Sequence, residues 1–142
     1  NDGKVMNMAP EQQILQVLEK FHQGLSGPAG SRRDWDALHA LAHPGATFIC
    51  QSPDEEACVY RLDTFISEIE SMAQEDGLYF DLTDTNAAPQ GPIATLSFDY
   101  SSYADPEKQV PLNQGHCVGL MLKDDADWKL MSLLWEFGQP GQ

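Results

Sequence analysis

The apolar residues of this chain repeat with two different periods, one mainly in its first half and the other in its second. Over residues 10–25 and 62–74 they recur every three or four positions, which is the spacing of an amphipathic helix. A shorter helix is expected after Asp34, an N-cap residue, with the sequence His-Pro-Gly at 43–45 ending it. From residue 78 onward apolar and polar residues alternate, as in strands with one buried face. This pattern predicts helices packed against a sheet.

The order of these segments decides the fold class. Five strands are expected, the last two joined by an acidic turn as an antiparallel hairpin: 46–50, 78–83, 93–103, 115–123 and 128–137. Helices and strands do not alternate regularly, so the fold class is α+β rather than a doubly wound sheet. The 142 residues, 42% of them hydrophobic, suit a single domain with one core. We expect this domain to span residues 10–138, after a flexible N-terminus at 1–9.

The charge of the chain restricts its partners. Eight Lys and Arg residues stand against 22 Asp and Glu residues, which gives a formal net charge of -14. This charge repels nucleic acid and anionic membranes, so neither is expected as a partner. The apolar stretches fall short of the roughly 20 residues that cross a bilayer. No motif indicates a cofactor, and both an exported and a cytoplasmic location remain open.

The cysteines give no framework of disulfides. Cys50, Cys58 and Cys117 are odd in number and lack the Cys-x-x-Cys spacing of thioredoxin-like motifs. One bridge between Cys50 and Cys58 stays open, provided that the chain turns back between them.

Three stretches together carry a resemblance to a known family: "ALHALAHPGATFIC" at 37–50, "ATLSFDY" at 94–100 and "DWKLMSLLWEF" at 127–137. The chain resembles the nuclear transport factor 2-like superfamily, which includes SnoaL-like polyketide cyclases, ketosteroid isomerases and scytalone dehydratases. The resemblance covers residues 10–138. It implies a cone, in which a curved mixed sheet of the cystatin-like type wraps over three helices and encloses a pocket. It also implies a homodimer, because many members associate through the outer face of the sheet.

The same resemblance speaks against steroid isomerase chemistry. Ketosteroid isomerases use a carboxylate base on the first strand, together with a tyrosine and a protonated aspartate as hydrogen-bond donors. In this sequence the corresponding positions fall on Cys50, on Phe21 and near Val118. None of these side chains supplies the required group, so no complete catalytic set is expected.

His116 is the candidate catalytic residue. It alternates in phase with Val118 and Leu120, whereas Lys123 falls in the opposite phase and suggests that the opposite face looks outward. This interpretation points His116 into the cone. There it is either a general acid or base, for which Tyr100 is a candidate partner, or only a polar anchor for a ligand.

The expected pocket is apolar and suits a small apolar or aromatic molecule, although side chains that simply fill the cone remain an alternative. In the last strand we expect Met131 and Leu133 to face inward, with Leu130 and Leu134 outward at a dimer interface. The predicted ligand-binding residues are Trp35, Cys50, Phe98, Tyr100, His116, Leu133, Trp135 and Phe137.

His39 and His43 stand four positions apart, a spacing that lets two imidazoles on a helix reach one metal ion. No third ligand is identifiable, so we predict no metal site. Three functions stay open at this stage: a small-molecule-binding protein, an isomerase, cyclase or dehydratase that uses His116, and a protein-interaction module.

Overall fold

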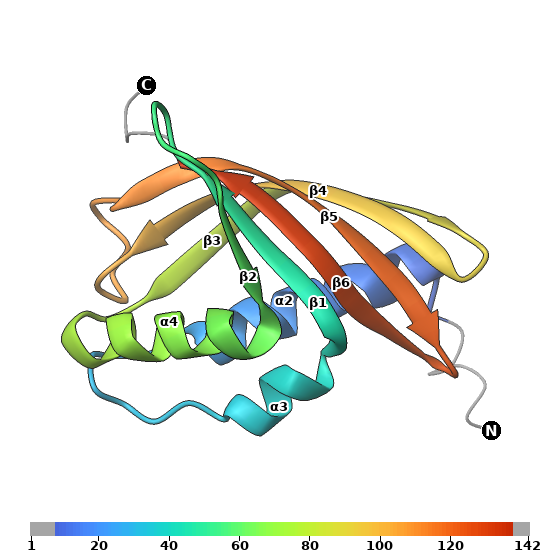
Figure 1. Cartoon of the computed structure of the whole chain (residues 1–142), viewed down its shortest axis with the longest axis horizontal. Coiled ribbons are helices and arrows are strands. Elements are labelled where there is room, and N and C mark those ends of the chain that lie inside the picture. The colour runs from blue at the N-terminus through green and yellow to red at the C-terminus, as the bar shows by residue number, and fades with distance from the viewer. Residues whose placement is uncertain (1–7, 138–142) are drawn as a thin grey trace.

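The computed structural model describes residues 8–137, and in it one curved sheet wraps over three helices (Figure 1). The helices are α2 (Pro10–Leu25), α3 (Trp35–Ala40) and α4 (Leu62–Glu75). The strands are β1 (Ala42–Gln51), β2 (Cys58–Arg61), β3 (Tyr79–Gln90), β4 (Ile93–Tyr103), β5 (Asn113–Asp124) and β6 (Asp127–Glu136). The fold class is therefore α+β, as predicted. The predicted end of the domain at 138 and most of the segment 1–9 lie outside the described residues.

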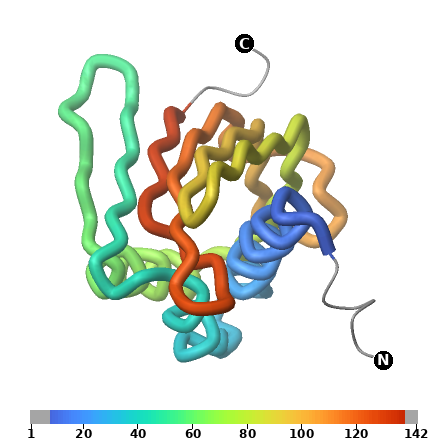
Figure 2. The backbone as a smooth tube through the Cα atoms, turned by 90° about the vertical axis from the view of Figure 1, so that its right-hand side faces the viewer, coloured from blue at the N-terminus to red at the C-terminus, as the bar shows by residue number. Residues whose placement is uncertain are grey.

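The sheet is mixed, and its strand order is β2-β1-β6-β5-β4-β3. The last strand, β6, lies beside the first strand, β1, and runs parallel to it, while the other neighbouring strands are antiparallel. The first and the last strand in sequence order thus lie side by side within the sheet. At one edge the tip of the β1–β2 hairpin extends beyond the neighbouring strands (Figure 2).

The two long helices form where their apolar stripes predict them. Pro10 occupies the first turn of α2, where its missing N–H costs no hydrogen bond. The stripe of α2 buries Ile14, Leu18, Phe21 and Leu25 against the inner face of the sheet. At the centre of the core, the Phe48 ring of β1 stacks on Phe21 and Phe65, with ring centroids 5.7 and 4.3 Å apart. These stacked rings join both long helices to the sheet.

The short helix α3 ends earlier than predicted. The Asp34 carboxylate accepts a hydrogen bond from the Ala37 N–H at 3.1 Å, so its role as N-cap is confirmed. The helix stops at Ala40, and the sequence His-Pro-Gly at 43–45 lies in β1 instead of ending the helix. Pairing between β1 and β6 is irregular between Ala42 and Thr47, where Pro44 has no N–H to donate to the ladder.

A bulge in β6 makes one sequence prediction wrong. The pairing of β5 with β6 shifts between Leu120 and Met121, so that Leu130 and Leu133 both turn to the core. Leu130 is fully buried, contrary to its predicted place on the outer face, whereas Leu134 does lie on the outer face. No helix within residues 8–137 is both long and apolar enough to span a bilayer.

Candidate ligand-binding cavity

A cavity of about 260 Å³ lies between the inner face of the sheet and the helices α2 and α4. The middle strands form its floor, and Phe21, Phe65 and Ile69 line it from the helices. Six of the eight residues predicted to bind a ligand lie together around it: Cys50, Phe98, Tyr100, Leu133, Trp135 and Phe137. These six side chains therefore line one partly open space between the sheet and the helices.

The placement of His116 in this cavity is wrong. Its side chain is 54% exposed on the outer face of the sheet, where Nδ1 lies 2.7 Å from Oδ1 of Asp99. The inner face of β5 carries Cys117, Gly119 and Met121 instead. Lys123 is on the same face of β5 as these inward residues, but it lies near the exposed end of the strand. Its charge therefore does not show which face of β5 points outward.

Two further positions change with this correction. Val118 is exposed on the outer face, so the side chain next to it that enters the cavity is Cys117. Trp35 also lies outside the cavity, beside Arg33 and Asp36 in a surface groove. The reason is that α3 contacts α2 and β1 and does not reach the space inside the cone.

His22 is the imidazole that does line the cavity, and the sequence analysis missed it. Its Nδ1 lies 3.0 Å from the backbone oxygen of Leu18, which can only accept, so Nδ1 carries the proton and Nε2 carries the lone pair. The ring stands edge-on to Phe80 and Phe98, with centroids 5.0 and 5.5 Å away. Burial lowers the pKa of His22 to about 4, although the hydrogen bond to Leu18 acts in the opposite direction. His22 is therefore neutral near pH 7 and offers one acceptor.

The sequence did contain a signal for His22. It lies four positions after Leu18 and three before Leu25, next to the apolar stripe of α2. A histidine that shares the buried side of an amphipathic helix must point toward the space which that helix covers.

Three further ionisable groups that line the cavity, Tyr100, Cys117 and Cys50, are also held neutral. The Tyr100 hydroxyl donates to the backbone oxygen of Glu136 at 2.9 Å, and burial raises the pKa of Tyr100. Burial likewise raises the pKa of Cys117 to about 12. For Cys50, burial is the largest cause of a raised pKa, and the neighbouring Cys58 adds to it. These groups present an uncharged interior.

Exposed apolar side chains mark the opening of the cavity. Met72 of α4 and Leu112, which precedes β5, are 57% and 50% exposed, yet both line the cavity. Glu68 lines the same region and places a carboxylate at the rim. The rim of the opening is therefore apolar and carries one acidic group.

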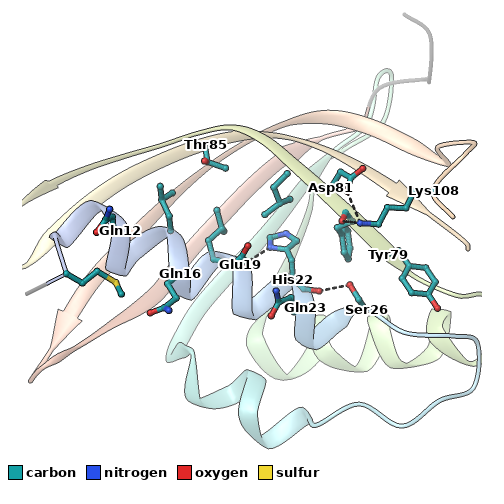
Figure 3. A pocket seen from close by; sticks show the side chains of 15 residues that line it. Gln12, Gln16, Glu19, His22, Gln23, Ser26, Tyr79, Asp81, Thr85 and Lys108 are labelled. Atoms are coloured by element: carbon teal, nitrogen blue, oxygen red, sulfur yellow. Dashed lines mark hydrogen bonds and ion pairs between the residues drawn. The ribbon is translucent and has the colours of Figure 1, made fainter. Parts of the chain in front are cut away.

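A second and more polar groove of about 900 Å³ runs between α2 and β3 (Figure 3). On the β3 side, Nζ of Lys108 contacts Oδ1 of Asp81 at 2.7 Å and the backbone oxygen of Phe80 at 3.0 Å. His22 rises from α2 between the two walls. His22 and Phe80 line both spaces, so together they separate the groove from the cavity.

The histidines considered for a metal site make separate contacts. Nε2 of His39 lies 3.1 Å from Oδ1 of Asp63, while Nδ1 of His43 accepts a hydrogen bond from the Gly45 N–H at 2.9 Å. His43 is in β1 rather than on the helix. No cluster of three metal-ligating side chains occurs within residues 8–137.

The sequence matches the SnoaL-like domain over residues 14–133. The chain belongs to the SnoaL-like domain family. Comparison with curated proteins finds no match. Solved structures similar to this SnoaL-like chain confirm the nuclear transport factor 2-like fold.

One similar structure is a nuclear transport factor 2-like protein from Cytophaga hutchinsonii, with 17% identity, a TM-score of 0.72, and coverage of 92% of this chain and 100% of that one. A second, a cystatin-like protein of unknown function from Nostoc punctiforme, has 11% identity, a TM-score of 0.71, and coverage of 92% and 91%. A third, provisionally assigned as a scytalone dehydratase from Novosphingobium aromaticivorans, has 13% identity, a TM-score of 0.69, and coverage of 90% and 83%. At such identities the likeness concerns the fold alone.

Proposed function

We propose that this SnoaL-like protein binds a small apolar or aromatic molecule inside the cone. The observation that carries the proposal is the apolar cavity of about 260 Å³, whose ionisable groups His22, Tyr100 and Cys117 are neutral. A cavity of about 150 Å³ already holds benzene. The volume here suits a molecule of one or two rings.

The charges around the cavity restrict the ligand further. A buried charge without a partner is costly, so the part of the ligand inside the cone is neutral. Glu68 at the rim and the net charge of -14 disfavour an anion. Nε2 of His22 favours a ligand with a hydroxyl or N–H group that can donate to it.

Mass spectrometry of molecules that co-purify with the chain would identify the ligand class directly. Binding of an aromatic probe, followed by the fluorescence of Trp135 and the other tryptophans, tests the site itself. Replacing Cys117 with Leu pushes a larger side chain into the cavity and should abolish binding. Replacing His22 with Phe removes the acceptor and should weaken a hydroxylated probe by about 0.5–1.5 kcal/mol, roughly two- to tenfold.

The matched control is His116→Phe, which makes the same change on the outer face and should leave binding unaltered. Circular dichroism would verify that each variant is folded. If folded Cys117→Leu binds the probe as tightly as the parent chain, the cavity is not the site and the proposal fails.

An enzyme of the isomerase, cyclase or dehydratase type is the alternative, and it cannot use the outward-facing His116. Within the cavity its base would have to be His22. A general base works best when its pKa lies near the working pH, whereas the pKa of His22 is lowered to about 4. This favours binding over proton transfer. Turnover of a bound ligand that is lost in His22→Phe would reverse the choice.

We also propose that two copies associate through the outer face of the sheet. Val118, Leu120 and Leu134 are large apolar side chains exposed there, in a shallow groove of about 810 Å³. The groove-lining residues within the described chain carry no formal charge. In a chain with a net charge of -14, an uncharged patch is where a second copy meets the least repulsion.

Sedimentation at micromolar concentration should show a dimer that Leu120→Asp converts to a monomer. Val110→Asp is the matched control, because Val110 is equally apolar and even more exposed but lies in the loop before β5. A parent chain that sediments as a monomer would contradict the proposal.

A further inference from the structure

Two cysteines come together where the chain turns back at the edge of the sheet. β1 and β2 are antiparallel, and their register places Cys50 directly opposite Cys58. Directly opposed residues of an antiparallel pair have Cα atoms about 4.5–5.5 Å apart, within the roughly 4.4–6.8 Å that a disulfide spans. Both thiols are free in this structure.

The side chains of the two cysteines also point to the same side of the sheet. Residues directly opposite each other in an antiparallel pair share a face. Cys50 lies on the inner face, since it lines the cavity, and the next inward pair along the strands is Phe48 with Tyr60. The Cys58 thiol is near enough to contribute to the raised pKa of Cys50, after the larger effect of burial.

The two cysteines differ in their access to solvent. Cys58 is exposed on the edge strand, whereas Cys50 is partly buried against the cavity. A dissolved oxidant therefore meets Cys58 first, and Cys50 is held beside it as a second thiol. This is the arrangement of an attacking and a resolving cysteine.

We propose that Cys50 and Cys58 form a reversible disulfide, with a low-molecular-weight disulfide such as oxidised glutathione as the oxidant. The Cys58 thiolate attacks one sulfur of the oxidant, whose S–S bond breaks and releases one glutathione, which takes up a proton. Cys50 then loses its proton and attacks Sγ of Cys58, which releases the second glutathione. Two protein thiols are oxidised, and one glutathione disulfide is reduced to two thiols.

The bond would join the wall of the cavity to the edge of the sheet. It closes the hairpin tip, residues 51–57, which extends beyond the neighbouring strands (Figures 1 and 2). It also fixes β2 directly before α4, and both Tyr60 of β2 and Phe65 of α4 line the cavity. A disulfide that fits the native fold stabilises it by restricting the unfolded chain, so the thermal midpoint of the oxidised form should be several degrees higher.

The test equilibrates the full chain with mixtures of oxidised and reduced glutathione, traps free thiols with acid and an alkylating agent, and maps the peptides by mass. The expected product links Cys50 to Cys58 and leaves Cys117 alkylated. Cys117→Ser, at a buried site on another strand, is the control and should give the same linked peptide. Cys50→Ser should instead accumulate glutathione on Cys58, because the resolving thiol is absent.

A second measurement separates a native site from chance reactivity. The same equilibration in urea measures disulfide formation in the unfolded chain. If the disulfide stabilises the native fold, the native fold must favour formation of the disulfide by the same factor. The equilibrium constant for disulfide formation with glutathione should therefore be about thirtyfold or more higher in the native chain than in the unfolded chain. An equal or lower constant in the native chain, a stable glutathione adduct on Cys58 of the parent chain, or bridges to Cys117 would each overturn the proposal.

Discussion

His22 of α2 and His116 of β5 lie on opposite sides of the sheet, and their surroundings give them different properties. His22 is packed among aromatic rings, has its Nδ1 hydrogen committed to Leu18, and has a pKa lowered to about 4. His116 is more than half exposed and contacts the carboxylate of Asp99. The comparison teaches that the face of an element, more than the residue type, decides whether a histidine can meet a ligand. Substitutions on the inner and the outer face should therefore differ in their effects.

The largest expected difference is in stability. Phe48 is fully buried on the inner face and packs against both Phe21 and Phe65, so Phe48→Ala should lower the free energy of unfolding by about 3–5 kcal/mol. Leu120 is half exposed on the outer face, and Leu120→Ala should change the stability of the monomer by about 0.5 kcal/mol or less. Urea titrations at a protein concentration too low for association measure both values.

Similar losses of stability for Phe48→Ala and Leu120→Ala in the dilute chain would contradict the assignment of a buried inner face and an exposed outer face. At high protein concentration the proposed dimer forms and adds to the stability of the parent chain. Leu120→Ala should then lower the free energy of unfolding by more than it does in the dilute chain. The cost of Phe48→Ala should change much less with concentration.

The next largest effect is the loss of stability in acid that His22 causes. Its pKa is about 4 in the folded chain against an ordinary 6.5, so as the pH falls the unfolded chain takes up this proton first. The part of the free energy of unfolding that depends on neutral His22 is fully present above pH 6.5. It decreases as the pH falls from 6.5 to about 4, and it changes little below that. With 1.36 kcal/mol for each pKa unit, the loss is about 3 kcal/mol.

The difference between the parent chain and His22→Phe isolates this contribution from the carboxylates, because they titrate in both. Chemical denaturation from pH 7 to pH 4 should therefore give a shallower acid loss in His22→Phe. His116→Phe should retain the contribution of His22. Equal slopes in the parent chain and His22→Phe would mean that His22 is not buried as the structure places it.

The sequence predicted best those elements whose two faces differ in polarity. The strand at 93–103 and the helix at 10–25 have the predicted bounds, because their buried positions are regularly spaced and clearly apolar. Residues 84–90, the second half of β3, were missed, since they lie in an edge strand, are mostly polar, and follow an irregularity at Asp84 with a φ of 51°. β2 was missed because it has four largely exposed residues.

The face of β5 could not be read from its residues. Val118 and Leu120 on the outside are as apolar as Cys117 and Met121 on the inside, so alternation alone gave two equal solutions. Six cavity residues were nevertheless predicted, since their strands have one clear inner face or were placed by the family resemblance. Only the packing of α2 against the sheet reveals that His22 lines the cavity.

The smallest expected effect concerns the outer pair of His116 and Asp99. The hydrogen bond from His116 is the largest cause that lowers the pKa of the Asp99 carboxyl. In His116→Ala this pKa should therefore rise toward the ordinary value of an aspartate, which a carbon-detected NMR titration of the carboxyl can follow. Water screens both exposed groups, so the stability at neutral pH should hardly change. Any contribution of the pair to the free energy of unfolding should disappear only as the pH falls through the pKa of Asp99.

Binding of an aromatic probe should stay the same in His116→Ala, because the pair of His116 and Asp99 lies across the sheet from the cavity. A loss of binding in His116→Ala as large as in His22→Phe would show that the outer face communicates with the cavity, and the separation of the two faces would be wrong.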